Sequence, residues 1–225
     1  MEKELKYFFA VVFTLFISPT FGQYSFGGGL SSLHGVNLDI TRVGAHAYFE
    51  QPRSEINTFY LRGTLMLPQK NSSTGSVEAV STEVSPQKLD GIRVEDKTSF
   101  FSVDGGTRIY FLNTYDAGFS LYGGGHLKGI ISSYSRTYDL SSFEDIDSDI
   151  DPNDYVTQNI EPLYSLLFSF GGNFGAKYQL PYRGALTFDL ALDLISRIVD
   201  PADILGNEIS PLSLSFNLSY RFDWY

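Results

Sequence analysis

The chain has 225 residues and no cysteine, so it is long enough for one domain of ordinary size and has neither disulfides nor thiolate metal ligands. Its net charge of -10 argues against a nucleic-acid partner, because phosphate binding needs a basic surface. Aromatic residues make up 16% of the chain and 21 glycines are scattered through it, a combination that favours β structure.

The first residues have the pattern of an export signal. Lys3 and Lys6 precede an apolar run of 11 residues, and Thr20 and Gly22 are small residues before a cleavage site. We predict a cleaved signal over residues 1–22 and a single domain over residues 23–225. A membrane anchor is the alternative, but a helix that spans a bilayer needs roughly 20 apolar residues.

Period-two alternation of apolar and polar residues dominates the rest of the chain, and it predicts strands. The predicted strands cover residues 23–31, 41–50, 57–67, 99–112, 117–132, 165–180, 185–194 and 211–225. Each is nine residues or longer, so all exceed the five or six residues of an ordinary soluble strand and reach the length of about nine to eleven that crosses a bilayer. Short connections alternate with long ones, and residues 68–98 and 133–162 are predicted to be long loops. This order predicts an all-β, eight-stranded antiparallel up-and-down barrel, with the short turns and both termini at its periplasmic end.

The polar face of these strands indicates what surrounds the barrel. It is rich in Ser, Thr, Asn and Gly, and its charges are of both signs, whereas the apolar face has almost no charge. A Lys or Arg facing lipid at mid-membrane costs roughly 2 to 4 kcal/mol, so an uncharged apolar face predicts contact with lipid. The charged residues then form a lumen network of Arg42, His46, Arg62, Asp104, Arg108, His126, Lys128, Lys177, Asp189, Asp193, Arg221 and Asp223. An eight-stranded barrel is filled by its own side chains, so we expect no open pore. A secreted soluble barrel that carries an apolar ligand is the alternative.

Two groups of residues suggest chemistry. His46 and His126 fall on the inward face near Ser and Asp, which would suit a lipid-modifying enzyme, but polar lumen residues usually form a hydrogen-bonded network. The acidic segment "FEDIDSDIDPND" suggests a loop cation site made by Asp145, Asp147, Asp149 and Asp151. Its sixth and twelfth positions are Ile150 and Val156, where a calcium loop of the EF-hand type has Gly and Glu. We therefore expect a solvated loop and no metal or other cofactor.

The mature chain resembles the small outer-membrane β-barrel proteins of the Bacteroidota. The resemblance rests on the export signal that ends before Gln23, the eight long alternating segments, the glycine pairs in "GGT" and "GGN", and the aromatic last strand. It implies localisation in the outer membrane of a Gram-negative bacterium, with membrane lipids and the barrel assembly machinery as partners. The assembly signal would comprise Tyr220, Phe222, Trp224 and Tyr225, although Trp224 is the in-phase aromatic residue and Tyr225 lies one step beyond it.

The expected role is structural and interactive rather than enzymatic. Some proteins of the group that the chain resembles serve in type IX protein secretion, so the resemblance allows a role as an accessory of a larger envelope or secretion complex. An outer-membrane lipid-modifying enzyme is the alternative function.

Overall fold

The computed structural model describes residues 24–36, 41–139, 151–157, 159–181, 184–199 and 210–224. The strands in these ranges are β1 (Tyr24–Gly35), β2 (Thr41–Ser54), β3 (Asn57–Ala79), β4 (Lys88–Leu112), β5 (Phe119–Asp139), β6 (Tyr155–Val156), β7 (Ile160–Leu180), β8 (Gly184–Val199) and β9 (Leu212–Trp224), with one 3-10 turn, η1 (Pro152–Asp154). The predicted signal, residues 1–22, lies outside the described residues. In the part of the chain that the structure describes, no helix is long and apolar enough to cross a membrane.

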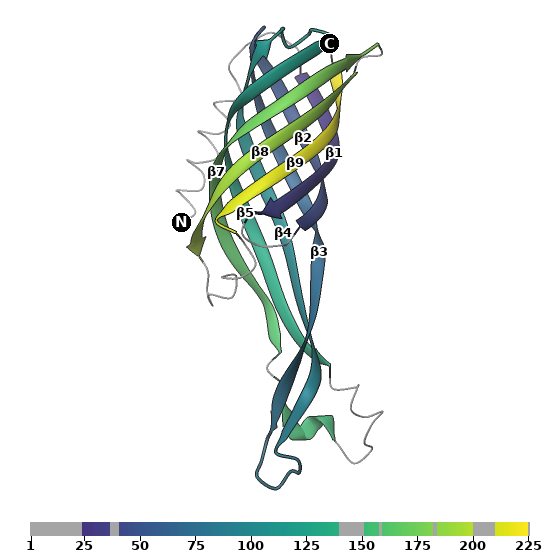
Figure 1. The fold of residues 1–225 in the computed structure, drawn as a ribbon, viewed down its shortest axis with the longest axis vertical. Coiled ribbons are helices and arrows are strands. Elements are labelled where there is room, and N and C mark those ends of the chain that lie inside the picture. Colours follow the sequence, from purple (N-terminus) through teal and green to yellow (C-terminus); the bar gives the residue numbers. More distant parts are fainter. Residues whose placement is uncertain are drawn as a thin grey trace.

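Eight of these strands close into a barrel in which every neighbouring pair is antiparallel (Figure 1). β1 lies between β2 and β9, the pairing continues through β8, β7, β5 and β4 to β3, and β3 pairs back to β2. The first and last strands pair along their length, from Tyr24 opposite Trp224 to Gly35 opposite Ser213. The predicted fold is confirmed, and a closed ring of this kind leaves no unpaired strand edge within the barrel wall.

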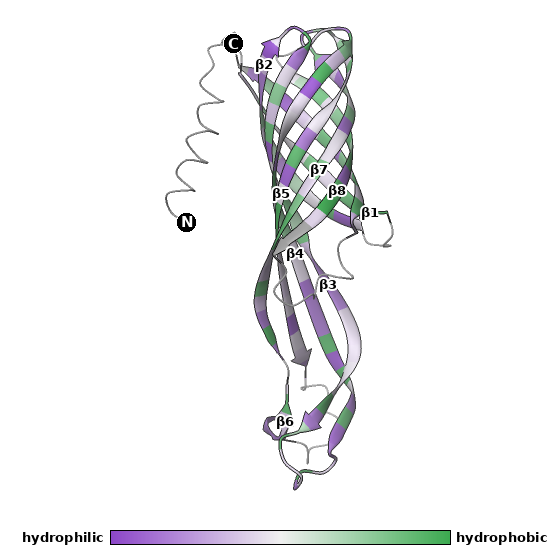
Figure 2. Cartoon of the chain, turned by 90° about the vertical axis from the view of Figure 1, so that its left-hand side faces the viewer, coloured by the Kyte–Doolittle hydropathy of each residue, from purple (hydrophilic) through white to green (hydrophobic). Residues whose placement is uncertain are grey.

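Apolar side chains cover the outside of the barrel and polar side chains fill its inside. On β9, Leu218 is 56% exposed, whereas its neighbours Asn217 and Ser219 are buried. On β1, Leu30 is 68% exposed and the adjacent Ser31 is buried. Figure 2 shows this alternation of hydrophilic and hydrophobic positions along the barrel strands. Successive strand residues point to opposite faces, so the apolar face is the outer one, and the alternative of a soluble carrier with an apolar interior is wrong.

Short connections gather at one end of the barrel, which we call the turn end. β2 and β3 are joined by Glu55 and Ile56, and β4 and β5 by residues 113–118. β7 ends at Leu180, which lies opposite Gly184, the first residue of β8. Tyr24 and Trp224, the first and last residues of the barrel strands, lie at this end as well. The predicted separation of short turns from long connections is confirmed.

The opposite end carries a projection that we call the extension (Figure 1). It consists of residues 68–79 of β3, 88–98 of β4, 133–139 of β5, 155–156 of β6 and 160–165 of β7. The prediction that residues 68–98 form a long loop is wrong, because β3 and β4 pair as far as Glu78 opposite Lys88. Residues 133–139 and 160–162 were likewise expected in a loop and continue β5 and β7. These strands lack alternation because both faces of residues 68–74 are exposed to solvent.

Candidate functional site

The lumen holds all the charged side chains that the sequence assigns to it. They project from seven of the eight barrel strands, and except for the half-buried Asp223 each residue is buried. The set is Arg42, His46, Arg62, Asp104, Arg108, His126, Lys128, Lys177, Asp189, Asp193, Arg221 and Asp223. Ion pairs and hydrogen bonds join most of these residues into three groups along the barrel axis.

Arg108 is the centre of the first group. Its Nη1 donates to Oε2 of Glu50 at 2.8 Å and its Nη2 donates to Oδ2 of Asp189 at 3.0 Å. The guanidinium also lies over the rings of Tyr60, Tyr122 and Tyr48, at 4.7, 4.9 and 5.4 Å from their centroids. A planar cation between carboxylates and aromatic faces is held in one orientation, so Arg108 obstructs the lumen.

Glu50 is the lumen residue that sequence reasoning missed. It is fully buried, accepts a hydrogen bond from Oγ1 of Thr58 at 2.6 Å, and lies 3.6 Å from Nη1 of Arg221. The alternation along β2 could have identified it. Glu50 lies an even number of positions from Arg42, His46 and Tyr48, so its side chain points to the same, inward face. Glu50 is a negatively charged partner of both Arg108 and Arg221. Without it, both guanidiniums would lose a compensating charge in an interior that holds little water.

Arg62 belongs to the first group and links Asp104 to it. Its Nε and Nη2 donate to the two oxygens of Asp104 at 3.0 and 2.9 Å, and its Nη1 lies 3.9 Å from Asp189. His46 lies nearby with its ring nitrogens hydrogen bonded to Ser31 and Ser219, at 2.7 Å each. The histidine therefore bridges β1 and β9 across the seam where the chain's first and last strands meet.

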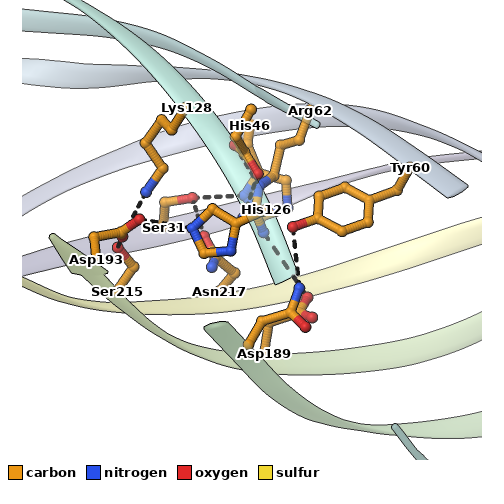
Figure 3. Close-up of polar contacts among 12 residues, drawn as sticks. Ser31, His46, Tyr60, Arg62, His126, Lys128, Asp189, Asp193, Ser215 and Asn217 are labelled. Atoms are coloured by element: carbon orange, nitrogen blue, oxygen red, sulfur yellow. Dashed lines mark hydrogen bonds and ion pairs between the residues drawn. The ribbon is translucent and has the colours of Figure 1, made fainter. Parts of the chain in front are cut away.

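Asp193 is the centre of the second group (Figure 3). It accepts from Lys128 Nζ at 2.6 Å, from Ser169 Oγ at 3.0 Å and from Ser215 Oγ at 3.0 Å, and it lies 2.6 Å from His126 Nε2. The two serines and His126 each contact the Asp193 carboxylate directly. In nucleophilic catalysis the serine hydroxyl instead hydrogen bonds to the histidine, which in turn contacts the acid. The contacts around Asp193 are those of a packed polar network. They do not form the Ser-His-acid triad that the enzyme alternative would need at this place.

A third group lies near the turn end. Arg221 Nε lies 2.7 Å from Asp223, whose other oxygen accepts from Gln179 at 2.9 Å, and the guanidinium lies over the ring of Tyr115 at 4.2 Å. Lys177 Nζ lies 5.2 Å from the centroid of the Tyr115 ring. Among the described residues, Lys177 Nζ has no hydrogen-bond partner. Large side chains therefore fill the lumen at this end too.

Apolar side chains close the lumen at the extension end. This apolar plug consists of Met66, Phe100, Ile130, Tyr134 and Leu167, and the Arg42 guanidinium lies 4.1 Å from the Phe100 centroid. A cavity of about 30 Å³ lies between the plug and the Arg62–Asp104 pair. That space holds about one water molecule and is too small for a ligand.

Glycines make room for the lumen tyrosines. A Cβ at Gly27 would collide with the Tyr48 ring, and one at Gly175 would collide with the Tyr122 ring and with the carbonyl oxygen of Phe188. Glycine at these two positions therefore leaves space for the rings of Tyr48 and Tyr122.

The predicted assembly signal lies on β9, between β1 and β8. Tyr220 and Phe222 face outward with their ring centroids 4.5 Å apart, and Phe222 is 61% exposed. Trp224 is opposite Tyr24 in the ladder. The Trp224 side chain and Tyr225 lie outside the described part of the structure.

Most of the predicted loop cation site also lies outside the described residues, at Asp145, Asp147 and Asp149. Asp151 is described, and its Oδ1 accepts from the backbone N and the Nδ2 of Asn153 at 2.9 Å each. Among the described residues no group of three or more His, Cys, Asp or Glu could hold a metal ion.

The extension has a small core of its own, separate from the lumen. Val77, Leu89, Ile92 and Tyr155 are buried against one another, and Tyr155 comes from the two-residue strand β6. Nearer the barrel, Asp96 accepts from Arg136 at 2.7 and 3.1 Å and from Tyr134 at 2.8 Å. The hydrogen bonds from Arg136 and then Tyr134 hold the pKa of Asp96 below its ordinary value. The extension is therefore an ordered unit and a second candidate site.

No protein-family model matches the chain, and no curated protein matches it significantly. Solved structures do match it. Neisserial surface protein A (NspA) is 11% identical, with 91% of this chain and 99% of that chain covered at a TM-score of 0.53. The shared feature is the fold. Two further matches are Ail of Yersinia pestis in complex with the heparin analogue sucrose octasulfate (10% identity, 90% and 98% covered, TM-score 0.45) and a major outer membrane protein from Thermus thermophilus (13% identity, 90% and 98% covered, TM-score 0.46).

The likeness to NspA agrees with the polarity of the barrel. An apolar exterior around a charged interior is stable in lipid and not in water, and closed antiparallel barrels of this kind are the spanning form found in outer membranes. The chain is therefore an integral outer-membrane β-barrel protein.

Proposed function

We propose that this protein has an interaction role in the cell envelope, in which the barrel is an anchor and the extension presents a binding surface. The observation that carries the proposal is the division of the molecule into a filled lumen, obstructed at Arg108 and closed by the apolar plug, and an ordered polar extension outside it. A filled lumen suits neither transport nor the binding of a ligand inside the barrel.

The proposal includes the orientation and the partners. The turn end faces the periplasm and the extension faces outward, as short turns and long connections are distributed in outer-membrane barrels. The barrel assembly machinery recognises β9 during insertion, and outer-membrane lipids surround the mature wall. A larger envelope or secretion complex binds the extension, in keeping with the resemblance to the small barrels of the Bacteroidota.

A pull-down with two matched variants tests this role. In the first variant, an Asn-Gly turn replaces residues 74–93 and so shortens the β3–β4 hairpin. In the second, a Gly-Ser link of equal length replaces residues 144–154, which leaves the hairpin intact. Both proteins carry an affinity tag before residue 24 and are isolated in mild detergent. Partner proteins should be lost with the first variant only, while heat-modifiable gel migration shows that both barrels are closed. Identical co-purifying proteins from both variants would refute the proposal.

A further inference from the structure

One edge of β3 is unpaired in the extension. β2 pairs with β3 only as far as Gly44 opposite Met66, and β6 pairs with the same edge at Glu78 and Ala79. Between these points, from Leu67 to Val77, no strand in the described part of the chain covers this edge, although β4 pairs with the other one. The unpaired N–H and C=O groups of such an edge can bind another extended chain.

The same edge already accepts an added strand within the molecule. β6 runs antiparallel to β3, with Val156 opposite Glu78 and Tyr155 opposite Ala79. Val80 N donates to the carbonyl oxygen of Asp154 at 2.8 Å, and the Tyr155 hydroxyl donates to the carbonyl oxygen of Pro86 at 2.9 Å. Two residues and one buried ring therefore hold a strand here, which shows the geometry that a longer segment would continue.

The edge of β3 also lacks the features that protect edges elsewhere in the extension. The opposite edge belongs to β7, whose residues 160–165 extend beyond β8 and include Pro162, which has no N–H. On β3, Pro68 lies beside the barrel and Lys70 is paired with Glu95 at 2.6 Å. Residues 71–77 carry neither charge nor proline, although charge and proline are what usually prevent strand addition.

A pocket next to this edge can take one side chain. It has a volume of about 230 Å³ and is lined by Ser76, Val77, Glu78, Ala79, Tyr138 and Val156. This is below the range of about 300 to 1,000 Å³ for small-molecule sites, so a single side chain of an added strand suits it better. The Glu78 carboxylate and the Tyr138 ring favour a lysine or arginine there.

We propose that residues 69–77 of β3 bind an extended, proline-free peptide segment of another protein by antiparallel strand addition, with a basic side chain of that segment in the pocket. This inference rests on the proposed interaction role and names the surface that serves it. The β3 edge of a second copy of the chain is not a suitable occupant. Two copies in one membrane have the same orientation, so their β3 strands would run parallel, whereas the strand that already pairs with this edge, β6, is antiparallel.

The test uses the full-length protein in lipid nanodiscs and a displayed library of ten-residue peptides. Peptides are selected on the intact protein and counter-selected on the variant in which Asn-Gly replaces residues 74–93. Hydrogen–deuterium exchange then locates the binding surface. We expect enriched peptides that contain a lysine or arginine, and protection of alternate amides within residues 69–77. Absence of enrichment, protection at other residues, or protection of these amides before any peptide is added would overturn the proposal.

Two proline substitutions make the test specific. Ser72 and Ser73 direct their N–H groups to opposite edges of β3, so Ser72→Pro and Ser73→Pro remove one donor from the free edge and one from the β4 ladder. The N–H of Val80 points to the edge that carries β6 and the N–H of Ala79 points to the β4 side, so Ser72 is the free-edge position and Ser73 the ladder position. Ser72→Pro should keep a closed barrel and bind the enriched peptide at least tenfold more weakly. If partner proteins need the extension but bind both proline variants normally, strand addition is wrong and the interaction role stands.

Discussion

Nη1 of Arg108 donates a hydrogen bond to Oε2 of Glu50 at 2.8 Å, and both side chains are enclosed in the lumen. Replacing Glu50 with Gln should lower the free energy of unfolding by about 3 to 5 kcal/mol, because it removes the charge that compensates two buried guanidiniums. The measurement is reversible urea unfolding in lipid vesicles. A double-mutant cycle with Arg108→Met should give a coupling energy of roughly 1 to 3 kcal/mol. Additive effects of the two substitutions would show that the pair is not formed.

The fit between Gly175 and Tyr122 predicts an effect of a single methyl group. Gly175→Ala should destabilise the barrel by roughly 1 to 3 kcal/mol, because the new Cβ would overlap the Tyr122 ring and the Phe188 carbonyl oxygen. Gly63→Ala is the matched control, since nothing lies within 4 Å of a Cβ at that strand position. Urea unfolding in vesicles measures both variants. Equal effects would contradict the proposed packing.

The outward position of Leu30 predicts a penalty that depends on lipid. Leu30→Arg should cost roughly 2 to 4 kcal/mol in vesicles, as expected for a charge near the bilayer midplane. Asn71→Arg places the same side chain on the solvent-exposed extension and should change stability by no more than about 0.5 kcal/mol. A small effect at position 30 would place that residue outside the lipid-facing band.

The Asp96–Arg136 pair predicts a response of the extension to acid. The pKa of Asp96 is lowered in the folded protein, so the pair contributes stability above the unfolded pKa of about 3.9 and loses it as the pH falls through the lower, folded value. Amide exchange in residues 93–97 and 135–138 should therefore be slow at neutral pH and, after correction for intrinsic rates, faster below about pH 4. In Asp96→Asn, exchange should be fast at both pH values. An unchanged acid response in that variant would assign the effect to another group.

The barrel could be predicted from the sequence because lipid surrounds it and polar groups fill it. Every barrel strand must therefore alternate outward apolar residues with inward polar ones. Leu218 beside Asn217 illustrates this rule, and the same parity predicted the inward position of Arg108. Glu50 was missed although its parity pointed inward.

Other features depend on interactions that periodicity does not encode. Residues 68–74 have solvent on both faces, so no alternation marked them as strand. The partners of Asp193 come from β5, β7 and β9 and depend on register, which a single sequence does not specify.

The central claim is that the apolar face of each barrel strand meets lipid and the polar face fills the lumen. The chain has no cysteine, so Asn217→Cys and Leu218→Cys each introduce one thiol for a nitroxide spin label. Electron paramagnetic resonance in lipid vesicles then measures collisions with oxygen, which concentrates in the bilayer, and with a water-soluble nickel complex. We predict that the label at residue 218 collides strongly with oxygen and weakly with nickel, whereas the label at residue 217 is shielded from both. Strong nickel collisions at residue 218, or lipid contact at residue 217, would contradict the account.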